Sequence, residues 1–316
     1  MSKSNMPFGN QGWDYSRTPD MSNKVVVITG GNSGIGFEAA KVLVGKGAQV
    51  TIFCRNEQKA KEAVAEIAKH TNDKGSIDYI LMDLARLDSV RSAADLFIAN
   101  HEKLDVLLNN AGLMMIPTKT LTEDGFETQF GVNHLGHFLF AQLLYPLVEK
   151  AQGRIIAVSS IAHMWGLKRI KFEDLNFDHG YSSTASYGQS KLANMLFVHE
   201  LQRRLKTADS AVNAYVVHPG YADTNLQRTG PGGIEKWMMV VFGRFFSHPP
   251  SHGAKSLVLA AADKEAQPVT FYGPAKRGGL GGPVGIFPIA PHGQDMDAAA
   301  KLWTVSEELT GAKWAI

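Results

Sequence analysis

Cysteine is almost absent from this sequence, since Cys54 is the only one among 316 residues. A single thiol can form neither an intrachain disulfide nor a multi-cysteine zinc or iron–sulfur site. A dominant charge is also missing, because 32 Lys and Arg are balanced by 30 Asp and Glu without any basic run. A net charge of +2 spread in this way offers little to a phosphate backbone. The composition therefore indicates a reducing compartment and no nucleic-acid partner.

Long apolar runs are missing as well. The longest nearly apolar stretch, residues 138–148, is interrupted by Gln142 and Pro146, whereas a membrane-spanning helix needs about 20 apolar residues. The first 20 residues contain no apolar core of a signal peptide, and we assign residues 1–21 to a polar N-terminal arm. We therefore expect no transmembrane segment and a cytoplasmic location.

The sequence does contain enough apolar residues, 44% against 20% charged, to bury a large core. From Lys24 onward, β-branched apolar runs alternate with helical patterns, which is the order of βα units. Seven runs are strand candidates: 24–29, 49–53, 77–82, 104–109, 153–159, 211–218 and 268–272. No linker divides the chain, so the sequence predicts an α/β fold over residues 22–316. We expect a single doubly wound Rossmann domain with a seven-stranded, mainly parallel sheet and helices on both faces.

Three segments depart from this alternation. Residues 161–186 are a polar excursion, and residues 221–250 hold the apolar cluster 237–242 among Gly and Pro, so we expect substrate specificity in both. The second of these is a candidate mobile substrate lid, although core packing or membrane contact would also explain its apolar character. Residues 273–285 contain six glycines without a following Gly-Lys-Ser/Thr, which favours a flexible surface loop over a phosphate-binding loop.

A glycine-rich turn, Thr29-Gly-Gly-Asn-Ser-Gly-Ile-Gly36, joins the first strand candidate to the first helix. Such a turn needs a residue that tolerates positive φ, and a dinucleotide pyrophosphate needs backbone without side chains in the way. The helix N-terminus then offers free N–H groups to the phosphates. Gly30, Gly34 and Gly36 fit these needs, although a plain strand-to-helix turn remains an alternative.

This turn resembles that of the classical short-chain dehydrogenase/reductase family. The resemblance covers about residues 22–275 and extends to further motifs in the family's order: Asn109-Asn-Ala-Gly112, Asn133, Ser160, Tyr187-Gly-Gln-Ser-Lys191 and Pro219-Gly-Tyr-Ala-Asp-Thr224. Three features resemble its retinol-dehydrogenase-like and WW-domain-oxidoreductase-like branch: Asn133-His-Leu-Gly-His137, the 26 residues between Ser160 and Tyr187, and Glu307-Glu-Leu-Thr-Gly. Unlike for many such members, we expect neither an N-terminal membrane anchor nor a WW domain here.

The resemblance implies a set of functional residues. The implied catalytic residues are Asn133, Ser160, Tyr187 and Lys191. The implied NADP-binding residues are Gly30, Asn32, Ser33, Gly34, Ile35, Gly36, Arg55, Asp83, Leu84, Asn110, Ala111, Gly112, Tyr187, Lys191, Pro219, Gly220 and Thr224. Asn133 would hold a water that links Lys191 to solvent, and Lys191 would also bond the nicotinamide ribose. The implied partner is an apolar aldehyde, ketone or alcohol of retinoid-like or steroid-like character, and a homo-oligomer is compatible with the family.

The chemistry of Tyr187 and Lys191 can be argued from the residues themselves. Hydride transfer to a carbonyl leaves an alkoxide, so a proton donor must stand beside the oxygen. Residues four apart on a helix lie about 6 Å apart on one face. One lysine charge at about 4 Å contributes roughly 4 kcal/mol at an effective dielectric near 20, which in principle suffices to bring the pKa of a tyrosine near neutrality before desolvation acts against it. The pair is therefore a candidate acid, although a surface lysine beside a half-buried tyrosine would look the same.

Serine, arginine and histidine side chains complete the candidates. Ser159 and Ser160 point to opposite sides of a strand end, so one of them can bond the substrate oxygen, and the resemblance favours Ser160. Arg55 follows the second strand where NAD-selective sites place an acid, which predicts NADPH over NADH unless Arg55 stacks on the adenine or points to solvent. His134 and His137 have no acidic third ligand nearby, so we expect no metal. His163 and His218 flank the predicted cleft and are left out of the catalytic set.

Two other functions stay open at this point. A carbon–carbon double-bond reductase of the protochlorophyllide-reductase-like type shares the tyrosine and the lysine. A non-catalytic dinucleotide sensor or scaffold needs no catalytic residues, so the presence of Asn133, Ser160, Tyr187 and Lys191 together argues against it.

Overall fold

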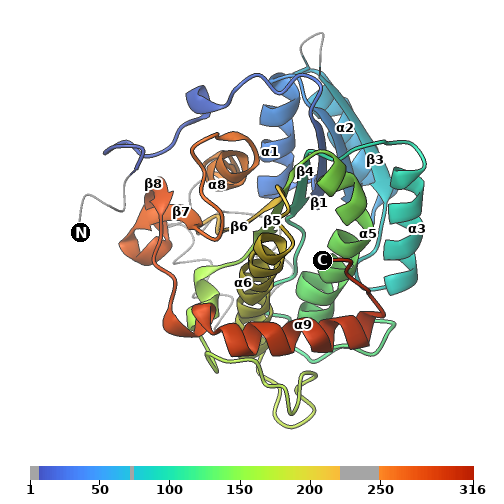
Figure 1. Cartoon of the computed structure of the whole chain (residues 1–316), viewed down its shortest axis with the longest axis vertical. Helices are drawn as coiled ribbons and strands as arrows, with labels where there is room; N and C mark the ends of the chain where they lie inside the picture. Colours follow the sequence, from blue (N-terminus) through green and yellow to red (C-terminus); the bar gives the residue numbers. More distant parts are fainter. Residues whose placement is uncertain (1–6, 72–74, 221–248) are drawn as a thin grey trace.

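The computed structural model describes residues 7–71, 75–220 and 249–316 (Figure 1). Its described part forms one eight-stranded sheet in the order β3-β2-β1-β4-β5-β6-β7-β8. The first seven strands are parallel, and β8 pairs antiparallel with β7. The strands are β1 (Val25–Thr29), β2 (Gln49–Cys54), β3 (Ser76–Leu81), β4 (Val106–Asn109), β5 (Arg154–Val158), β6 (Asn213–Val217), β7 (Phe271–Lys276) and β8 (Gly281–Ile286). The strand order reverses between β1 and β4, which is where such sheets bind ligands.

The predicted fold class is confirmed, but the number of strands and the glycine-rich loop were predicted wrongly. Residues 273–285 form most of β7 and β8 rather than a flexible surface loop. Phe271 and Tyr272 on β7 and Val284 on β8 are buried, so this hairpin has a core-facing side despite its six glycines. Gly278 and Gly279, with φ of 65° and 88°, make the turn. The glycines therefore serve a tight connection and a close strand pairing.

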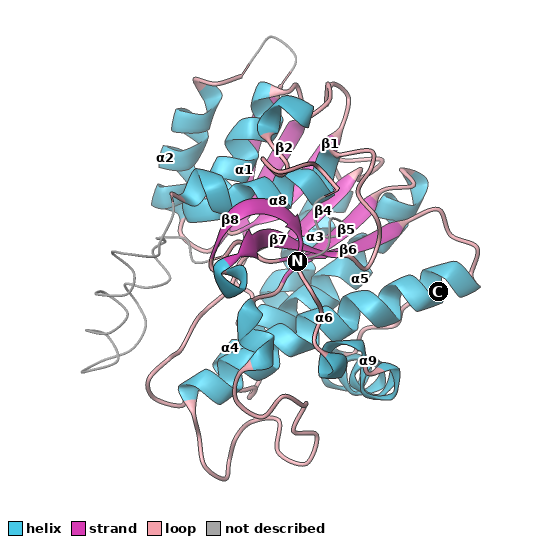
Figure 2. Ribbon diagram, turned by 90° about the vertical axis from the view of Figure 1, so that its left-hand side faces the viewer, coloured by secondary structure: helices cyan, strands magenta, loops and turns pink. Residues whose placement is uncertain are grey.

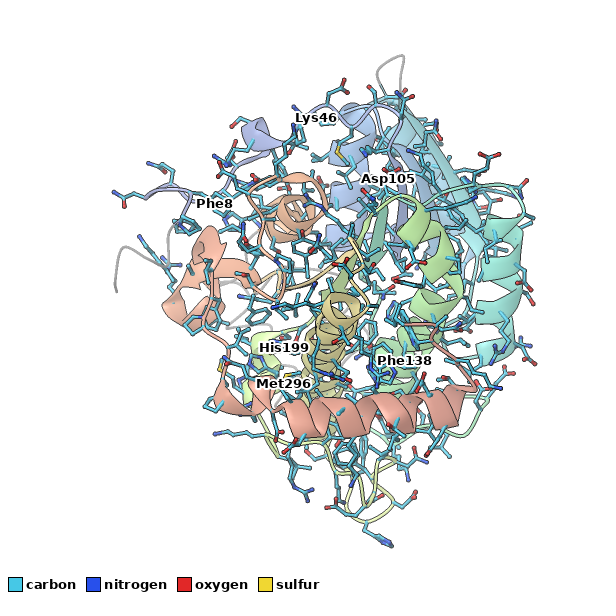
Figure 3. All side chains as sticks on the ribbon, in the orientation of Figure 1. Phe8, Lys46, Asp105, Phe138, His199 and Met296 are labelled. Carbon is cyan, nitrogen blue, oxygen red and sulfur yellow. The ribbon has the colours of Figure 1, made fainter. Side chains whose placement is uncertain are left out.

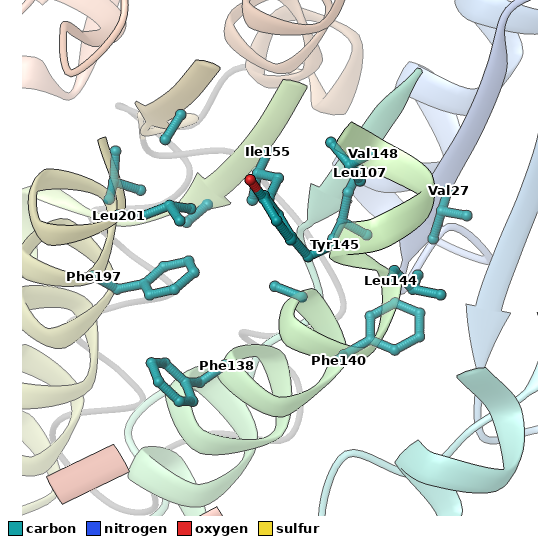
Figure 4. Packing of buried hydrophobic residues seen from close by; sticks show 14 of the residues in the cluster. Val27, Leu107, Phe138, Phe140, Leu144, Tyr145, Val148, Ile155, Phe197 and Leu201 are labelled. Atoms are coloured by element: carbon teal, nitrogen blue, oxygen red, sulfur yellow. The ribbon is translucent and has the colours of Figure 1, made fainter. Parts of the chain in front are cut away.

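Helices cover both faces of the sheet (Figure 2), and alternate residues of β1 face opposite layers. Val26 and Ile28 pack with α1 (Gly34–Gly45), α2 (Glu57–Ala68) and α8 (Pro250–Ala262). Val25 and Val27 pack with α3 (Leu87–Ile98), α5 (Gly136–Lys150) and α6 (Ser183–Thr207). Figure 4 shows the second layer, where aromatic side chains of α5 and α6 fill the space above the sheet. This period of two buries both faces of the sheet, as a doubly wound fold requires.

The approach to α5 is irregular. A short helix, α4 (Thr128–Phe130), leads into a π-helical turn over Gly131–Leu135, and α5 continues from it. Gly136 donates its backbone N–H to the carbonyl oxygen of Gly131, five residues earlier. Such π turns are rare and are frequent at functional sites. Asn133, one of the candidate catalytic residues, lies inside this turn.

The last helix, α9 (Met296–Thr310), crosses α6 and α5 (Figure 1). Its Trp303 packs edge-on against Phe138 of α5, which Figure 3 labels, with ring centroids 5.1 Å apart. Among the described residues, no helix combines the length and the apolarity that crossing a bilayer requires.

The predicted N-terminal arm is packed against the domain in its described part. Trp13 is buried, and its Nε1 donates to the carboxylate of Asp263 at 2.6 Å. The backbone N–H of Trp13 donates to the carbonyl oxygen of Val284 on β8 at 2.8 Å. This segment therefore lies along the β8 edge of the sheet.

Candidate active site

The glycine-rich turn closes against the loop that follows β4. Gly30 and Gly34 have φ of 66° and 59°, which favours glycine. A Cβ on Gly36 would lie 2.6 Å from the carbonyl oxygen of Gly30 and would overlap the side-chain amide of Asn110. A Cβ on Gly30 would lie 3.0 Å from the Cα of Ala111. The turn can therefore pack this tightly only with glycines, and it leads directly into the N-terminus of α1.

Thr29 connects β1 to the same loop. Its Oγ1 accepts hydrogen bonds from the backbone N–H groups of Asn110 and Ala111, both at 2.9 Å. The side chain of Asn110 donates in turn to the carbonyl oxygen of Thr29 at 2.7 Å. These bonds fix the start of the predicted motif Asn109–Gly112 beside the glycine turn.

Asn133 fixes the other end of that loop. Its Nδ2 donates to the carbonyl oxygen of Leu113 and to Ser190 Oγ, both at 2.9 Å. Its Oδ1 accepts from the backbone N–H of Leu113 at 2.7 Å. Both amide hydrogens of Asn133 are therefore used within the protein, and the side chain acts as a clamp on Leu113.

Tyr187 and Lys191 lie together on α6, as their spacing predicts. Both are buried, with 6% and 4% of their surface exposed. Lys191 Nζ lies 5.8 Å from the centroid of the Tyr187 ring and donates to the carbonyl oxygen of Val158 at 3.0 Å. A Cβ on Gly112 would lie 3.4 Å from this Nζ, so the absence of a side chain at Gly112 keeps open the space beside the pair.

Burial dominates the protonation of this pair. It raises the pKa of Tyr187 to about 12, although a hydrogen bond with Ser160 acts in the opposite direction. It also lowers the pKa of Lys191 to about 8. The expectation that the lysine charge brings the pKa of Tyr187 near neutrality is therefore not met in this structure. The reason is that burial removes water from around the phenolate, while the ammonium group of Lys191 donates to the carbonyl oxygen of Val158.

The two neighbouring serines have different partners. Ser159 is 1% exposed and donates its hydroxyl to the carbonyl oxygen of Lys191 at 2.7 Å. Ser160 is half-buried, accepts from the backbone N–H of Ala162 at 3.1 Å, and shares a hydrogen bond with Tyr187. The serine beside the tyrosine is therefore Ser160.

His163 contacts this site although the sequence prediction left it out. Its Nδ1 lies 2.6 Å from the carbonyl oxygen of Ser160, which also accepts the backbone N–H of His163. The three-residue spacing was the only signal for this contact. His218 instead packs against aromatic rings, with centroids 4.7 Å from Phe271 and 5.0 Å from Phe287.

The other predicted cofactor residues gather at the carboxyl edge of the sheet. Arg55 is exposed directly after β2, and Asp83 is half-buried after β3, where its Oδ1 accepts the backbone N–H of Ala85 at 2.9 Å. Leu84 is buried. Five more are half-buried, two of them after β6: Asn32, Ser33, Ile35, Pro219 and Gly220. Residues 221–248 lie outside the described residues, and they include Thr224 and nearly all of the predicted lid at 225–250.

His134 and His137 face different partners. His134 Nε2 lies 2.9 Å from Ser306 Oγ on α9, whereas His137 Nε2 lies 2.8 Å from Thr29 Oγ1 on β1. Burial lowers the pKa of His134 to about 3 and that of His137 to about 4. In the described ranges, no group of three or more His, Cys, Asp or Glu side chains is arranged to hold a metal ion.

Comparisons with known proteins agree with this geometry. A family profile described as short chain dehydrogenase matches residues 24–172. Mouse retinol dehydrogenase 12 is 40% identical over 294 residues, covering 92% of this chain and 87% of its own. Human retinol dehydrogenase 11 is 43% identical over 245 residues, covering 77% and 74% respectively.

Solved structures give the same result. A crystal structure of an uncharacterized protein from Mycobacterium paratuberculosis has a TM-score of 0.79 at 37% identity, covering 96% of this chain and 100% of its own. The NADP complex of RhlG from Pseudomonas aeruginosa shares the fold, with a TM-score of 0.62 at 21% identity over 80% of this chain and 94% of its own. On this sequence similarity and this fold, the chain belongs to the short-chain dehydrogenase family and to its retinol-dehydrogenase-like branch.

Proposed function

We propose that the protein is an NADP(H)-dependent oxidoreductase that interconverts a carbonyl and an alcohol on an apolar small molecule. The observation that carries this proposal is the grouping of Tyr187, Ser160 and Lys191 at the same sheet edge as the glycine-rich turn. This edge is where doubly wound folds bind dinucleotides.

The residues at this edge suit a dinucleotide. The turn brings bare backbone to the N-terminus of α1, where free N–H groups favour phosphate. Gly112 leaves the space beside Lys191 free of a side chain, and Lys191 is a hydrogen-bond donor for a ribose. When bound, a nicotinamide cofactor supplies or accepts the hydride.

The proton step belongs to Tyr187. With a pKa of about 12, the phenol carries its proton at neutral pH and can donate it to the alkoxide oxygen formed by hydride transfer to a carbonyl. Ser160 positions that oxygen through its hydroxyl, and a charged Lys191 stabilises the phenolate that remains. The pKa of Lys191 near 8 keeps most of its charge at neutral pH.

The preference for NADPH rests on Arg55, which is exposed at the end of β2. A guanidinium can make charge-assisted hydrogen bonds to a 2′-phosphate, which contribute about 1.5 to 3 kcal/mol, or roughly 10- to 150-fold in affinity. We expect kcat/KM to favour NADPH over NADH and Arg55→Asp to reverse that ratio. Lys59→Asp, the same charge change at an exposed position on α2, is the control. An unmodified enzyme that prefers NADH would remove Arg55 from this role.

The substrate class is tested by products. The relatives named retinol dehydrogenases support an apolar substrate, so NADPH consumption should be measured with retinal, steroid ketones and aliphatic aldehydes. An alcohol product supports the proposal, and a saturated carbonyl product supports the double-bond reductase instead. Tight NADPH binding without turnover on any of them would favour the sensor or scaffold.

Cellular location and assembly are part of the same proposal. The single cysteine, Cys54, is buried, which suits a cytoplasmic protein in a reducing compartment. Cell fractionation should recover the chain in the supernatant, and recovery with membranes would contradict this. Light scattering after gel filtration tests for a homo-oligomer.

A further inference from the structure

His137 is a buried polar side chain that the proposed chemistry does not use. It is 3% exposed and lies on α5 facing β1. Its Nε2 is 2.8 Å from Thr29 Oγ1, and its Nδ1 is 3.1 Å from the carbonyl oxygen of Asn133. The ring therefore joins the strand that carries the glycine turn to the π turn that carries Asn133.

The hydrogen-bond partners of Thr29 and His137 determine which ring nitrogen of His137 carries the hydrogen. Backbone N–H groups can only donate, so Asn110 and Ala111 occupy both lone pairs of the Thr29 hydroxyl. Its own hydrogen points to His137 Nε2, because the alternative acceptor, the carbonyl oxygen of Leu108, is 3.5 Å away. Nε2 is thus an acceptor, and a neutral ring carries its hydrogen on Nδ1, which donates to the carbonyl oxygen of Asn133. Burial keeps the ring neutral, because it lowers the pKa of His137 to about 4.

These bonds form a closed hydrogen-bond network around the loop after β4. Thr29, which bonds His137, accepts from Asn110 and Ala111, and the side chain of Asn133 bonds Leu113. Gly112 lies between them, where a Cβ would come within 3.1 Å of Asn133 Oδ1 and 3.4 Å of Lys191 Nζ. This hydrogen-bond network therefore fixes the backbone of Gly112 relative to Lys191.

We propose that His137 is a positioning residue for the cofactor: through Thr29 and Asn133 it holds the backbone of residues 110–113 in the place that the dinucleotide requires beside Lys191. This proposal rests on the proposed function, since it takes the dinucleotide to bind at this sheet edge. His137 itself touches neither substrate nor reacting atoms in this role.

His134 provides a matched control from the same segment. It is 1% exposed and lies three residues before His137. Ser306 donates its hydroxyl to the carbonyl oxygen of Leu302 at 2.7 Å, so it accepts from His134 Nε2 at 2.9 Å. His134 therefore carries its hydrogen on Nε2, opposite to His137, and its partners are Ser306 on α9 and Asn194 on α6 instead of the cofactor loop.

The first test is a tautomer measurement that needs no activity. The full chain is labelled with ¹⁵N-histidine, and the ring nitrogens are detected through their carbon-bound ring protons. The signals are assigned from their loss in His134→Gln and in His137→Gln. We expect the Nδ1–H tautomer at His137 and the Nε2–H tautomer at His134. An Nε2–H tautomer or a charged ring at His137 would overturn the proposal.

The second test is NADPH affinity, measured by fluorescence on folded variants. His137→Asn keeps a donor near the Asn133 carbonyl and removes the acceptor for Thr29, whereas His137→Gln can keep that acceptor. We expect a rise in Kd of about tenfold for His137→Asn, a partial rescue in His137→Gln, and a change below about twofold for His134→Asn. The KM for NADPH should rise with Kd while kcat changes less.

The outcomes separate the proposed role of His137 from the proposed function of the protein. A His137→Asn variant that binds NADPH as the unmodified chain does, or a His134→Asn variant that is equally weakened, would overturn the role of His137. If His137→Asn fails to fold, Thr29→Val removes the same hydroxyl from the other side and should raise Kd by a similar factor, with Thr29→Ser restoring it. An unmodified chain that binds neither NADPH nor NADH would contradict the proposed function, and with it the role of His137, even if the tautomer is as expected.

Discussion

Two pairs of buried ionisable side chains lie on neighbouring helices, and they behave differently. Tyr187 and Lys191 lie on α6, and His134 and His137 lie on the π turn and α5. Burial lowers the pKa of both histidines far enough to leave them neutral, and each neutral ring bonds a named partner. Burial lowers the pKa of Lys191 only to about 8, so this side chain keeps a charge inside the protein at neutral pH. The proposed catalytic pair thus differs from the histidine pair by a buried charge, which the histidine pair lacks.

The sharpest test of this difference is Tyr187→Phe. Removing the general acid should lower turnover by about 10² to 10⁴, while the fold and the Kd for NADPH change little. Steady-state kinetics and fluorescence titration measure the two effects. Turnover like that of the unmodified chain would show that Tyr187 is not the proton donor.

Ser160 and Ser159 allow the same comparison between a proposed catalytic side chain and a structural one, here with uncharged groups. Ser160→Ala removes a hydroxyl beside Tyr187 and should lower kcat by about 10² to 10³, as the loss of one donor to a developing oxyanion does. Ser159→Ala removes a bond to the carbonyl oxygen of Lys191 and should mainly reduce stability. Equal kinetic losses in the two variants would mean that the assignment of Ser160 is wrong.

Lys191→Met should abolish turnover and stabilise the protein at pH 7. The pKa of Lys191 falls from 10.5 to about 8 on folding, so the cost of burying its charge is complete below pH 8. Between pH 8 and 10.5 the unfolded chain binds more protons, and this cost fades as the pH rises. We expect a gain of up to roughly 3 kcal/mol at pH 7 that is mostly lost near pH 10. Urea unfolding at the two pH values measures it, and a loss of stability at pH 7 would contradict the stated cost.

The smallest effect is expected for His134→Ala. This change removes a bond to Ser306 and part of the packing against α9, so the free energy of unfolding should fall by about 1 to 3 kcal/mol. Turnover per folded molecule should stay within about twofold, since the hydrogen-bond partners of His134, Ser306 and Asn194, are not among the candidate catalytic residues. A large loss of kcat would remove the contrast between the two pairs.

The sequence predicted the parts of this fold that depend on local pattern. Seven apolar runs became strands, and β1, β2, β4, β5 and β6 among them are almost completely buried, which is why their continuous apolar pattern was informative. The eighth strand escaped prediction because glycine dominates residues 278–285, and its burial depends on pairing with β7.

Prediction of the site met a similar limit. Tyr187 and Lys191 could be paired from their helical spacing, but the balance between burial and charge that sets their pKa values depends on packing. The contact between Thr29 and His137 joins residues 108 positions apart, so no local sequence pattern predicts it. The partner of Ser159, the carbonyl oxygen of Lys191, lies 32 positions away for the same reason.

The packing of Trp13 bears on the β8 edge of the sheet. An open sheet ends in strands whose free N–H and C=O groups can recruit another chain. Here the backbone of Trp13 bonds the carbonyl oxygen of Val284, and Pro283 lacks an N–H to offer. Gly12 allows this close approach, because a Cβ there would lie 2.6 Å from that same oxygen. The N-terminal segment thus occupies a backbone acceptor of the β8 edge, and we expect its removal to leave the carbonyl oxygen of Val284 open to another strand.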